Sequence, residues 1–143
     1  MVIQLEPISA TAVVPATPEA VFRFLSRLEN HWKLADRWID VIELDDGSGR
    51  VRMRGPLGLS RTARTVVVDA QPDSVMHGTA ELDGTRALIA WELYEVANGT
   101  EVRLSAEIEK ASVFDRLLLL FGGAAWMRRR FEAILENLAQ QFS

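Results

Sequence analysis

The last thirty or so residues carry the longest hydrophobic repeat of the chain. At about 100° per residue, the apolar side chains between Ser112 and Phe142 fall on one broad stripe, which is typical of a helix lying on a core. The stripe consists of Leu117, Leu120, Phe121, Ala124, Met127, Phe131, Leu135, Leu138 and Phe142. Ser112 followed by Asp115 fits a helix N-terminus. The pattern predicts a single helix of about 45 Å, long enough to need a wide surface beneath it.

Between residues 38 and 110 the hydrophobic pattern changes to the alternation of half-buried strands. Asp83-Gly84 and Asn98-Gly99 are strong hairpin signals. Strands are predicted at residues 38–45, 50–54, 62–70, 74–82, 85–96 and 100–110. In the last two of these, charged residues alternate with apolar ones, so one face is wet and the other dry. The region is predicted to be a curved antiparallel meander.

The first third of the chain contains another strand and two short helices. Ile8–Val14 is apolar and β-branched, as in a strand that ends at Pro15. Thr17 and Pro18 are an N-cap and a preferred first helical residue. A second short helix is predicted over Leu28–Ala35, with Trp32 as its anchor. The predicted order is strand, two short helices, six strands and a long helix, in one domain spanning residues 1–143.

This order resembles the helix-grip fold of the START-like superfamily, also called SRPBCC, which includes polyketide cyclase/dehydrase-like proteins and the major birch pollen allergen. The segment Val14–Phe22 (VPATPEAVF) is similar to the strand-then-helix opening of that family, and Leu28–Trp32 (LENHW) to its second helix. The resemblance implies an α+β fold: a seven-stranded curved antiparallel sheet, two short helices after the first strand, and a long C-terminal helix over the concave face. It also implies a deep apolar cavity between sheet and long helix, often holding a lipid, sterol, polyketide or other hydrophobic molecule.

Composition narrows the classes of function. A chain of 143 residues is long enough to bury a real core without cross-links. The absence of cysteine excludes a disulfide framework, a thiolate zinc site and a thiol nucleophile. We expect a soluble cytoplasmic protein, because no secretory signal or membrane-length apolar run is found. The net charge of −4 argues against a nucleic-acid partner. No cofactor is expected.

A cavity wall is one of two interpretations of the inward-facing strand residues. Trp91 shares its strand face with Ala87, Ile89 and Leu93, so it either fills the core or lines a cavity. On the neighbouring strand, Gly78 and Ala80 are small and would leave room opposite the indole. The predicted ligand-binding residues are Trp32, Met53, Met76, Gly78, Trp91, Phe121 and Arg128.

Arg128 lies on the apolar stripe of the long helix, where a charge needs a partner or a route to water. It would either extend to water at the cavity rim or contact a ligand carboxylate. The other arginines, at positions 50, 52, 54, 61 and 64, could form an anion-binding strip. We favour the ordinary interpretation, in which they pair with Glu43 and Asp45 across the hairpin.

The two histidines are weak catalytic candidates. His77 is the first candidate for a general base, provided that it faces inward, whereas His31 sits beside Trp32 near a helix end. A hydrogen-bonded structural ring is the more ordinary role for either. Neither stands at metal-ligand spacing, so no metal site is expected.

Leu119 and Trp126 lie opposite the main stripe of the long helix and flank Gly122-Gly123. A glycine pair inside a helix costs about 1 kcal/mol per residue and should have a reason. Either the helix kinks and the apolar phase rotates, or it stays straight and shows an outward apolar patch. Such a patch would support a homodimer or gate the cavity mouth.

Three functions follow from these features. The first is a non-enzymatic module that binds a hydrophobic small molecule between the sheet and the C-terminal helix. The second is an enzyme of the polyketide cyclase or dehydratase type, acting by cavity shape and one general acid or base. The third is a protein-interaction module whose cavity is vestigial.

Overall fold

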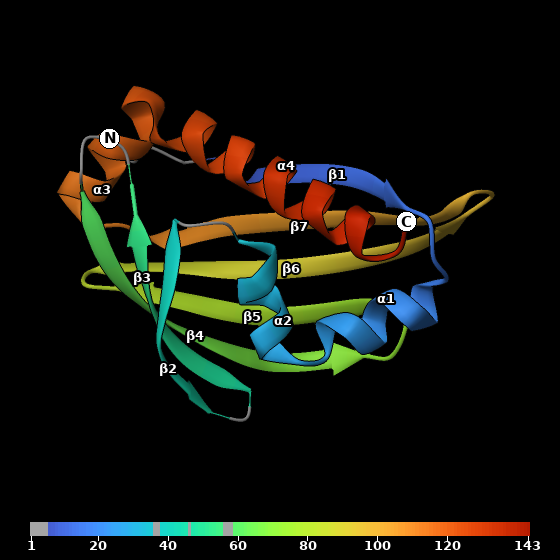
Figure 1. The fold of residues 1–143 in the computed structure, drawn as a ribbon. Coiled ribbons are helices and arrows are strands. Elements are labelled where there is room, and N and C mark those ends of the chain that lie inside the picture. The colour runs from blue at the N-terminus through green and yellow to red at the C-terminus, as the bar shows by residue number, and fades with distance from the viewer. Residues whose placement is uncertain (1–5, 36–37, 46, 56–58) are drawn as a thin grey trace.

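The computed structural model describes residues 6–35, 38–45, 47–55 and 59–143. Seven strands form one antiparallel sheet in the order β1-β7-β6-β5-β4-β3-β2 (Figure 1). The strands are β1 (Ile8–Val14), β2 (Ile39–Asp45), β3 (Ser48–Arg54), β4 (Ser60–Gln71), β5 (Val75–Leu82), β6 (Thr85–Val96) and β7 (Gly99–Lys110). The helices are α1 (Pro18–Leu25), α2 (Leu28–Leu34), α3 (Val113–Leu118) and α4 (Ala124–Gln141), with a π-helical turn at Leu119–Gly123.

The predicted fold class is confirmed: a curved antiparallel sheet carries two short helices early in the chain and the C-terminal helices at its end. The bounds of β1 and β6 are those predicted, and the start of α1 is marked by Thr17, whose side chain accepts a hydrogen bond from the amide of Ala20. The dry face of β7 is buried at Val102, Leu104 and Ala106. Alternation of polar and apolar residues therefore located the sheet and its inner face correctly.

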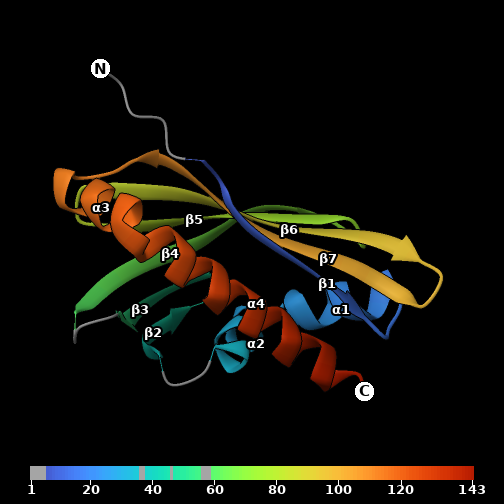
Figure 2. The same cartoon turned by 90° about the horizontal axis from the view of Figure 1, so that it is seen from above.

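The main core lies where α4 crosses the β1 end of the sheet (Figure 2). Leu135 and Leu138 of α4 are completely buried, and Phe131 and Ile134 nearly so. They belong to one cluster with the inner side chains of β1 and β7 and with the buried residues of α1 and α2, including Val14, Val102, Leu104, Val21, Leu25 and Leu34. The C-terminal half of the predicted stripe therefore packs on the core, as expected.

The predicted long C-terminal helix runs from Val113 to Gln141, but it is kinked at the glycine pair, which is the first of the two alternatives drawn from the sequence. Phe121 has ψ 45° and Gly122 has φ 107°, so the helix is broken between α3 and α4. The positive φ at Gly122 favours glycine. At Gly123 a Cβ would lie 2.5 Å from the carbonyl oxygen of Leu118, so this close approach also needs glycine. The glycine pair is the physical reason for the kink.

The kink rotates the apolar phase, which decides between the two alternatives for Leu119 and Trp126. Both are partly buried against the core rather than forming an outward patch. Trp126 meets the buried Trp38 edge to face at 5.7 Å, and the guanidinium of Arg130 lies 5.0 Å from the Trp126 ring centroid. The exposed apolar residues of this region are instead Val113, Phe114, Leu117, Leu120 and Phe121, the last of them 82% exposed.

A buried carboxylate anchors α3 to the end of the sheet. Asp115 accepts hydrogen bonds from both terminal nitrogens of Arg61 on β4 and from the hydroxyl of Thr85 at the start of β6. Its backbone amide donates to Ser112 Oγ at 3.2 Å, which confirms the predicted N-cap. Burial alone would raise the pKa of Asp115, but the bonds from Arg61 and Thr85 outweigh it and lower the pKa below 3.8. None of the helices in the described residues is long and apolar enough to span a membrane.

Candidate functional site

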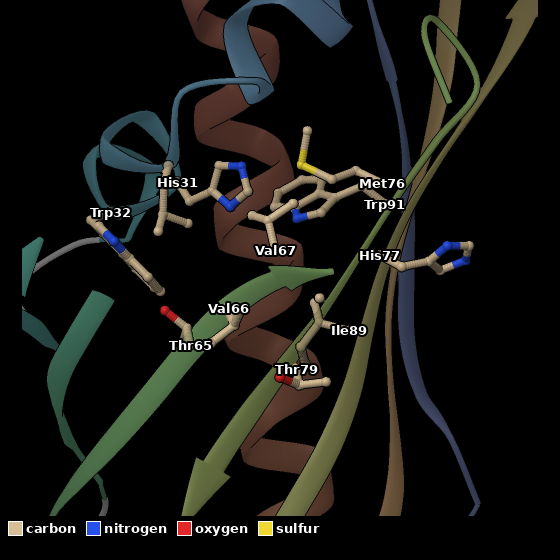
Figure 3. A pocket seen from close by; sticks show the side chains of 12 residues that line it. His31, Trp32, Thr65, Val66, Val67, Met76, His77, Thr79, Ile89 and Trp91 are labelled. Atoms are coloured by element: carbon tan, nitrogen blue, oxygen red, sulfur yellow. The ribbon is translucent and has the colours of Figure 1, made fainter. Parts of the chain in front are cut away.

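A cavity of about 70 Å³ lies between α2 and the middle of the sheet (Figure 3). The helix contributes its face, β4 and β5 contribute the opposite wall, and β6 contributes two large side chains. The lining residues are Leu28, His31, Trp32, Thr65, Val66, Val67, Met76, His77, Gly78, Thr79, Ile89 and Trp91. This lining is mainly apolar and includes no Lys, Arg, Asp or Glu.

This cavity lies beside the short helix α2, whereas the prediction placed one between the sheet and the C-terminal helix. None of the lining residues belongs to α4. Beneath α4, its own Phe131, Leu135 and Leu138 belong to the buried cluster formed with β1 and β7. Among the described residues, the part of the concave face that the short helix α2 covers holds this cavity.

Gly78 is needed because the backbone of β4 passes close to it. The register of this pair shifts between Val67 and Asp69, so β4 carries one extra residue at this point. A Cβ on Gly78 would lie 2.8 Å from the carbonyl oxygen of Val66. Trp91 pairs with Met76 on the next strand and is buried. The large indole, the flexible Met76 side chain and the missing side chain of Gly78 together shape the wall.

The imidazole ring of His31 lies in the cavity. In Figure 3 the ring extends from α2 toward Trp91 and Met76. Its centroid lies 5.3 Å from that of Trp91, and Nε2 lies 2.7 Å from the carbonyl oxygen of Leu25. A carbonyl oxygen only accepts, so Nε2 carries the proton and donates.

The protonation state of His31 follows from its burial. Removal from water lowers the pKa of His31 below 6.5, and the hydrogen bond to Leu25 opposes this only in part. The ring is thus neutral near pH 7. In a neutral ring with the proton on Nε2, Nδ1 has a free lone pair.

The condition set for His77 as a general base is not met. Its side chain points away from the cavity (Figure 3) and is 49% exposed. Its Nδ1 lies 2.8 Å from Asp69 Oδ1 on the outer face of the sheet. Alternation along β5 explains the outcome, because His77 lies between the inward-facing Met76 and Gly78 and therefore points outward.

Of the seven predicted ligand-binding residues, the structure brings together Trp32, Met76, Gly78 and Trp91. Met53 packs against the core without lining the cavity. Phe121 and Arg128 are exposed on the C-terminal helices and do not line it. The kink turns Phe121 outward. The face of α4 that contains Arg128 does not line the cavity.

Sequence reasoning gave His31 only a minor role, although a signal was present. Leu28, His31 and Trp32 stand at positions i, i+3 and i+4 of one short helix and so share one face. The helical spacing therefore places His31 on the same face as Trp32. Trp32 itself has a further feature: its buried Nε1 has no hydrogen-bond partner within the described residues.

Of the predicted pairs between the arginines and Glu43 or Asp45, the structure confirms the one between Arg50 and Glu43, at 3.5 Å, whereas Arg54 pairs with Asp40 instead. Arg61 belongs to the Asp115 cluster instead. No group of three His, Asp or Glu side chains that could hold a metal occurs among the residues that the structure describes.

A family model described as "Polyketide cyclase / dehydrase and lipid transport" matches residues 7–143 of the chain. The match therefore spans every strand and helix described above. No curated protein matches the chain.

Several solved structures share the fold over almost the full length of the chain. TTHA0849 from Thermus thermophilus is 20% identical with a TM-score of 0.69, covering 96% of this chain and 97% of that one. Protein Ms6760 from Mycobacterium smegmatis is 11% identical with a TM-score of 0.72, covering 96% and 90%. The KanY protein is 16% identical with a TM-score of 0.75, covering 98% and 99%. At these identities the likeness concerns the fold alone.

Proposed function

The chain belongs to the polyketide cyclase/dehydrase and lipid transport family, and from this premise we propose that it binds an apolar small molecule in the cavity between α2 and strands β4 to β6. The observation that carries the proposal is the lining of the cavity: the walls are mainly apolar with a few polar groups, among them His31, Thr65 and Thr79, as in many small-molecule sites. The apolar surface comes from Trp91, Met76 and Ile89. Gly78 has no side chain, so it leaves the space beside it open.

The volume of the cavity limits what it holds without rearrangement. An engineered apolar cavity of about 150 Å³ takes up benzene. At about 70 Å³, the cavity accommodates one end of a ligand, and a complete ring requires side chains such as Leu28 or Met76 to change rotamer. Methionine is suited to such adjustment because its side chain is unbranched.

The proposal is tested by native mass spectrometry of the protein purified from its own host. An additional small mass is expected to remain with the wild-type chain. Val67→Phe should remove it by filling the cavity, whereas Val68→Phe should retain it, because Val68 is 61% exposed on β4 and does not line the cavity. Retention of the same mass by both variants would place the ligand elsewhere.

A second candidate function, an enzyme of the cyclase or dehydratase type, is supported by one observation. His31 is a neutral imidazole held in the cavity by Leu25, and a neutral imidazole can take up a proton from a substrate. His31 would thus replace His77 as the general base.

The two functions differ in what a His31 variant would retain. His31→Gln keeps an N–H donor for Leu25 but loses the base. If the protein is a carrier, wild type and variant should hold the same molecule, in different amounts. If it is an enzyme, the variant should accumulate a precursor instead. An undehydrated precursor is heavier than the wild-type ligand by one water, and an uncyclised isomer has the same mass but a different chromatographic retention.

A further inference from the structure

We propose that the cavity selects neutral, flat, apolar molecules that carry one hydrogen-bond donor, a hydroxyl or N–H group on the ring, and that this donor is bound by Nδ1 of His31. The inference rests on the proposed function, since it names the class of ligand for the same cavity.

The hydrogen bond to Leu25 fixes the direction of the His31 imidazole. Leu25 lies at the end of α1, and its carbonyl oxygen holds Nε2 at 2.7 Å. Nδ1 is at the opposite side of the ring, which in Figure 3 faces Val67 and Trp91 inside the cavity. Leu25 is the one hydrogen-bond partner of the ring that the described residues provide. His31 therefore presents an acceptor without a protein partner to the ligand space.

The unpartnered acceptor of His31 changes the free energy of ligand binding. A buried acceptor that loses its water without gaining a donor makes binding weaker. A ligand hydroxyl or N–H removes this penalty, whereas an ether or a hydrocarbon of the same shape does not. Discrimination by such a group is stronger than discrimination by apolar size alone.

The cavity disfavours a negatively charged ligand. A carboxylate would face the lone pair of Nδ1 and lose its hydration, and no Lys or Arg lines the cavity to compensate. Arg128, which the sequence offered as a carboxylate partner, is exposed and lies outside the cavity. The ligand class is therefore neutral.

Phenol, anisole and benzoate form a matched set of probes for this selection. Phenol carries the donor, anisole has lost it but kept the ring and the oxygen, and benzoate adds a negative charge. Anisole is more apolar than phenol, so burial alone would favour anisole. Because anisole is also larger by one methyl group, a preference for phenol is assigned to its hydroxyl group only if the preference is lost when His31 is replaced.

Binding is measured by NMR on the indole N–H signals of the four tryptophans. Trp32 and Trp91 line the cavity, while Trp38 and Trp126 contact each other outside it and serve as internal controls. For the wild-type chain, phenol should shift the Trp32 and Trp91 signals with a Kd about tenfold lower than that of anisole. Benzoate should bind more weakly than phenol.

Two variants of the same residue type separate the role of Nδ1 from general effects. His31→Phe keeps a flat ring and removes both nitrogens, so the preference should reverse in favour of anisole. His77→Phe changes the outward-facing histidine and should leave the preference for phenol intact. Should His31→Phe fail to fold, the nitrogen spectrum of wild-type His31 provides an independent measurement: Nδ1 should be unprotonated and its signal should move when phenol is added.

The outcomes are distinguishable. Equal or tighter binding of anisole by the wild-type chain, tighter binding of benzoate, or a proton on Nδ1 would overturn this inference and leave the proposed function standing. Failure of all three probes to move the Trp32 and Trp91 signals would contradict the proposed function and the inference together.

Discussion

His31 couples the cavity to the pH dependence of stability. The folded protein holds the ring neutral, with its pKa below 6.5, while the unfolded chain takes up a proton freely. The stabilisation is therefore present above about pH 6.5 and is lost as the pH falls through the lower folded-state pKa.

We predict that the free energy of unfolding of the wild-type chain falls between about pH 8 and about pH 5, and that His31→Gln shows a smaller fall. The measurement is urea unfolding at a series of pH values. His77→Gln is the control, because His77 is half exposed on the outer face. If the pH dependence persisted in His31→Gln but disappeared in His77→Gln, it would arise from His77, and the prediction would be wrong.

Gly78 shows how a single missing side chain shapes the wall of the cavity. We predict that Gly78→Ala lowers the free energy of unfolding by about 1–3 kcal/mol, because the new Cβ meets the Val66 carbonyl oxygen at 2.8 Å. Gly55→Ala is a suitable control: its Cβ would make an ordinary contact of 3.5 Å, and the expected change is under about 0.5 kcal/mol. Equal losses of stability in Gly78→Ala and Gly55→Ala, measured by chemical denaturation, would show that β4 shifts to accommodate the new Cβ.

At the scale of elements, the broken C-terminal helix has two unlike parts. α4 buries its apolar face on β1, whereas α3 and the turn after it leave a row of large apolar side chains exposed. The same stripe in the sequence therefore has two different energetic roles.

This difference predicts unequal effects for two phenylalanines of one stripe. Phe131→Ala should lower the free energy of unfolding by about 3–5 kcal/mol, because the ring is 5% exposed. Phe121→Ala should change it by less than about 0.5 kcal/mol, because the ring is 82% exposed. The measurement is the denaturation midpoint of each variant. A large loss of stability in Phe121→Ala would indicate a straight helix that buries this ring.

The anchor of α3 is predicted to be sensitive to acid. Asp115→Asn removes a buried charge from the guanidinium of Arg61 and should lower the free energy of unfolding by about 3 kcal/mol. Because the pKa of Asp115 is depressed below 3.8, its contribution is present above that pH and is lost as the pH falls through the folded-state value. The acid-unfolding curve of the variant should lack this component.

Asp69→Asn is the matched control for this prediction. It breaks the pair with His77, but Asp69 is 64% exposed, so a change under about 1 kcal/mol is expected. A comparable loss of stability in both variants would argue against a special role for the Asp115 cluster.

At the scale of the whole molecule, two helical elements divide the concave face. α4 covers the end formed by β1 and β7 and packs its buried side chains there, and α2 covers the middle of the sheet, where this cavity lies (Figures 1 and 2). The cavity thus belongs to a short helix of seven residues, which is held at its ends by a few bonds, among them that from Asn137 of α4 to the Leu34 carbonyl at 2.8 Å.

Occupation of this cavity should stabilise the entire fold. A ligand that binds only the folded state at about 100 times its Kd raises the free energy of unfolding by about 2.7 kcal/mol. We predict a rise of this size for phenol near that concentration, measured as a shift of the urea midpoint. The filled variant Val67→Phe should show no rise, and a rise in it equal to that of the wild type would indicate binding at another place.

The sequence by itself determined the order of the elements, the fold class and the face of each strand that is buried. These features depend on residues close to one another along the chain, such as the Asp83-Gly84 turn or the alternation around Trp91. It also predicted four of the residues that line the cavity, because strand alternation and helix spacing decide on which side Trp32, Met76, Gly78 and Trp91 lie.

Only the tertiary structure decided where the cavity is and which histidine enters it. The position depends on the distance between segments remote in sequence: α4 packs on one end of the sheet, and Val66 passes close to Gly78 at the bulge of β4. The direction of the helix after Gly122 likewise depends on how Trp126 meets Trp38, 88 positions earlier. Periodicity fixes the face on which a side chain lies, but contact between distant elements decides whether that face meets a core, a cavity or water.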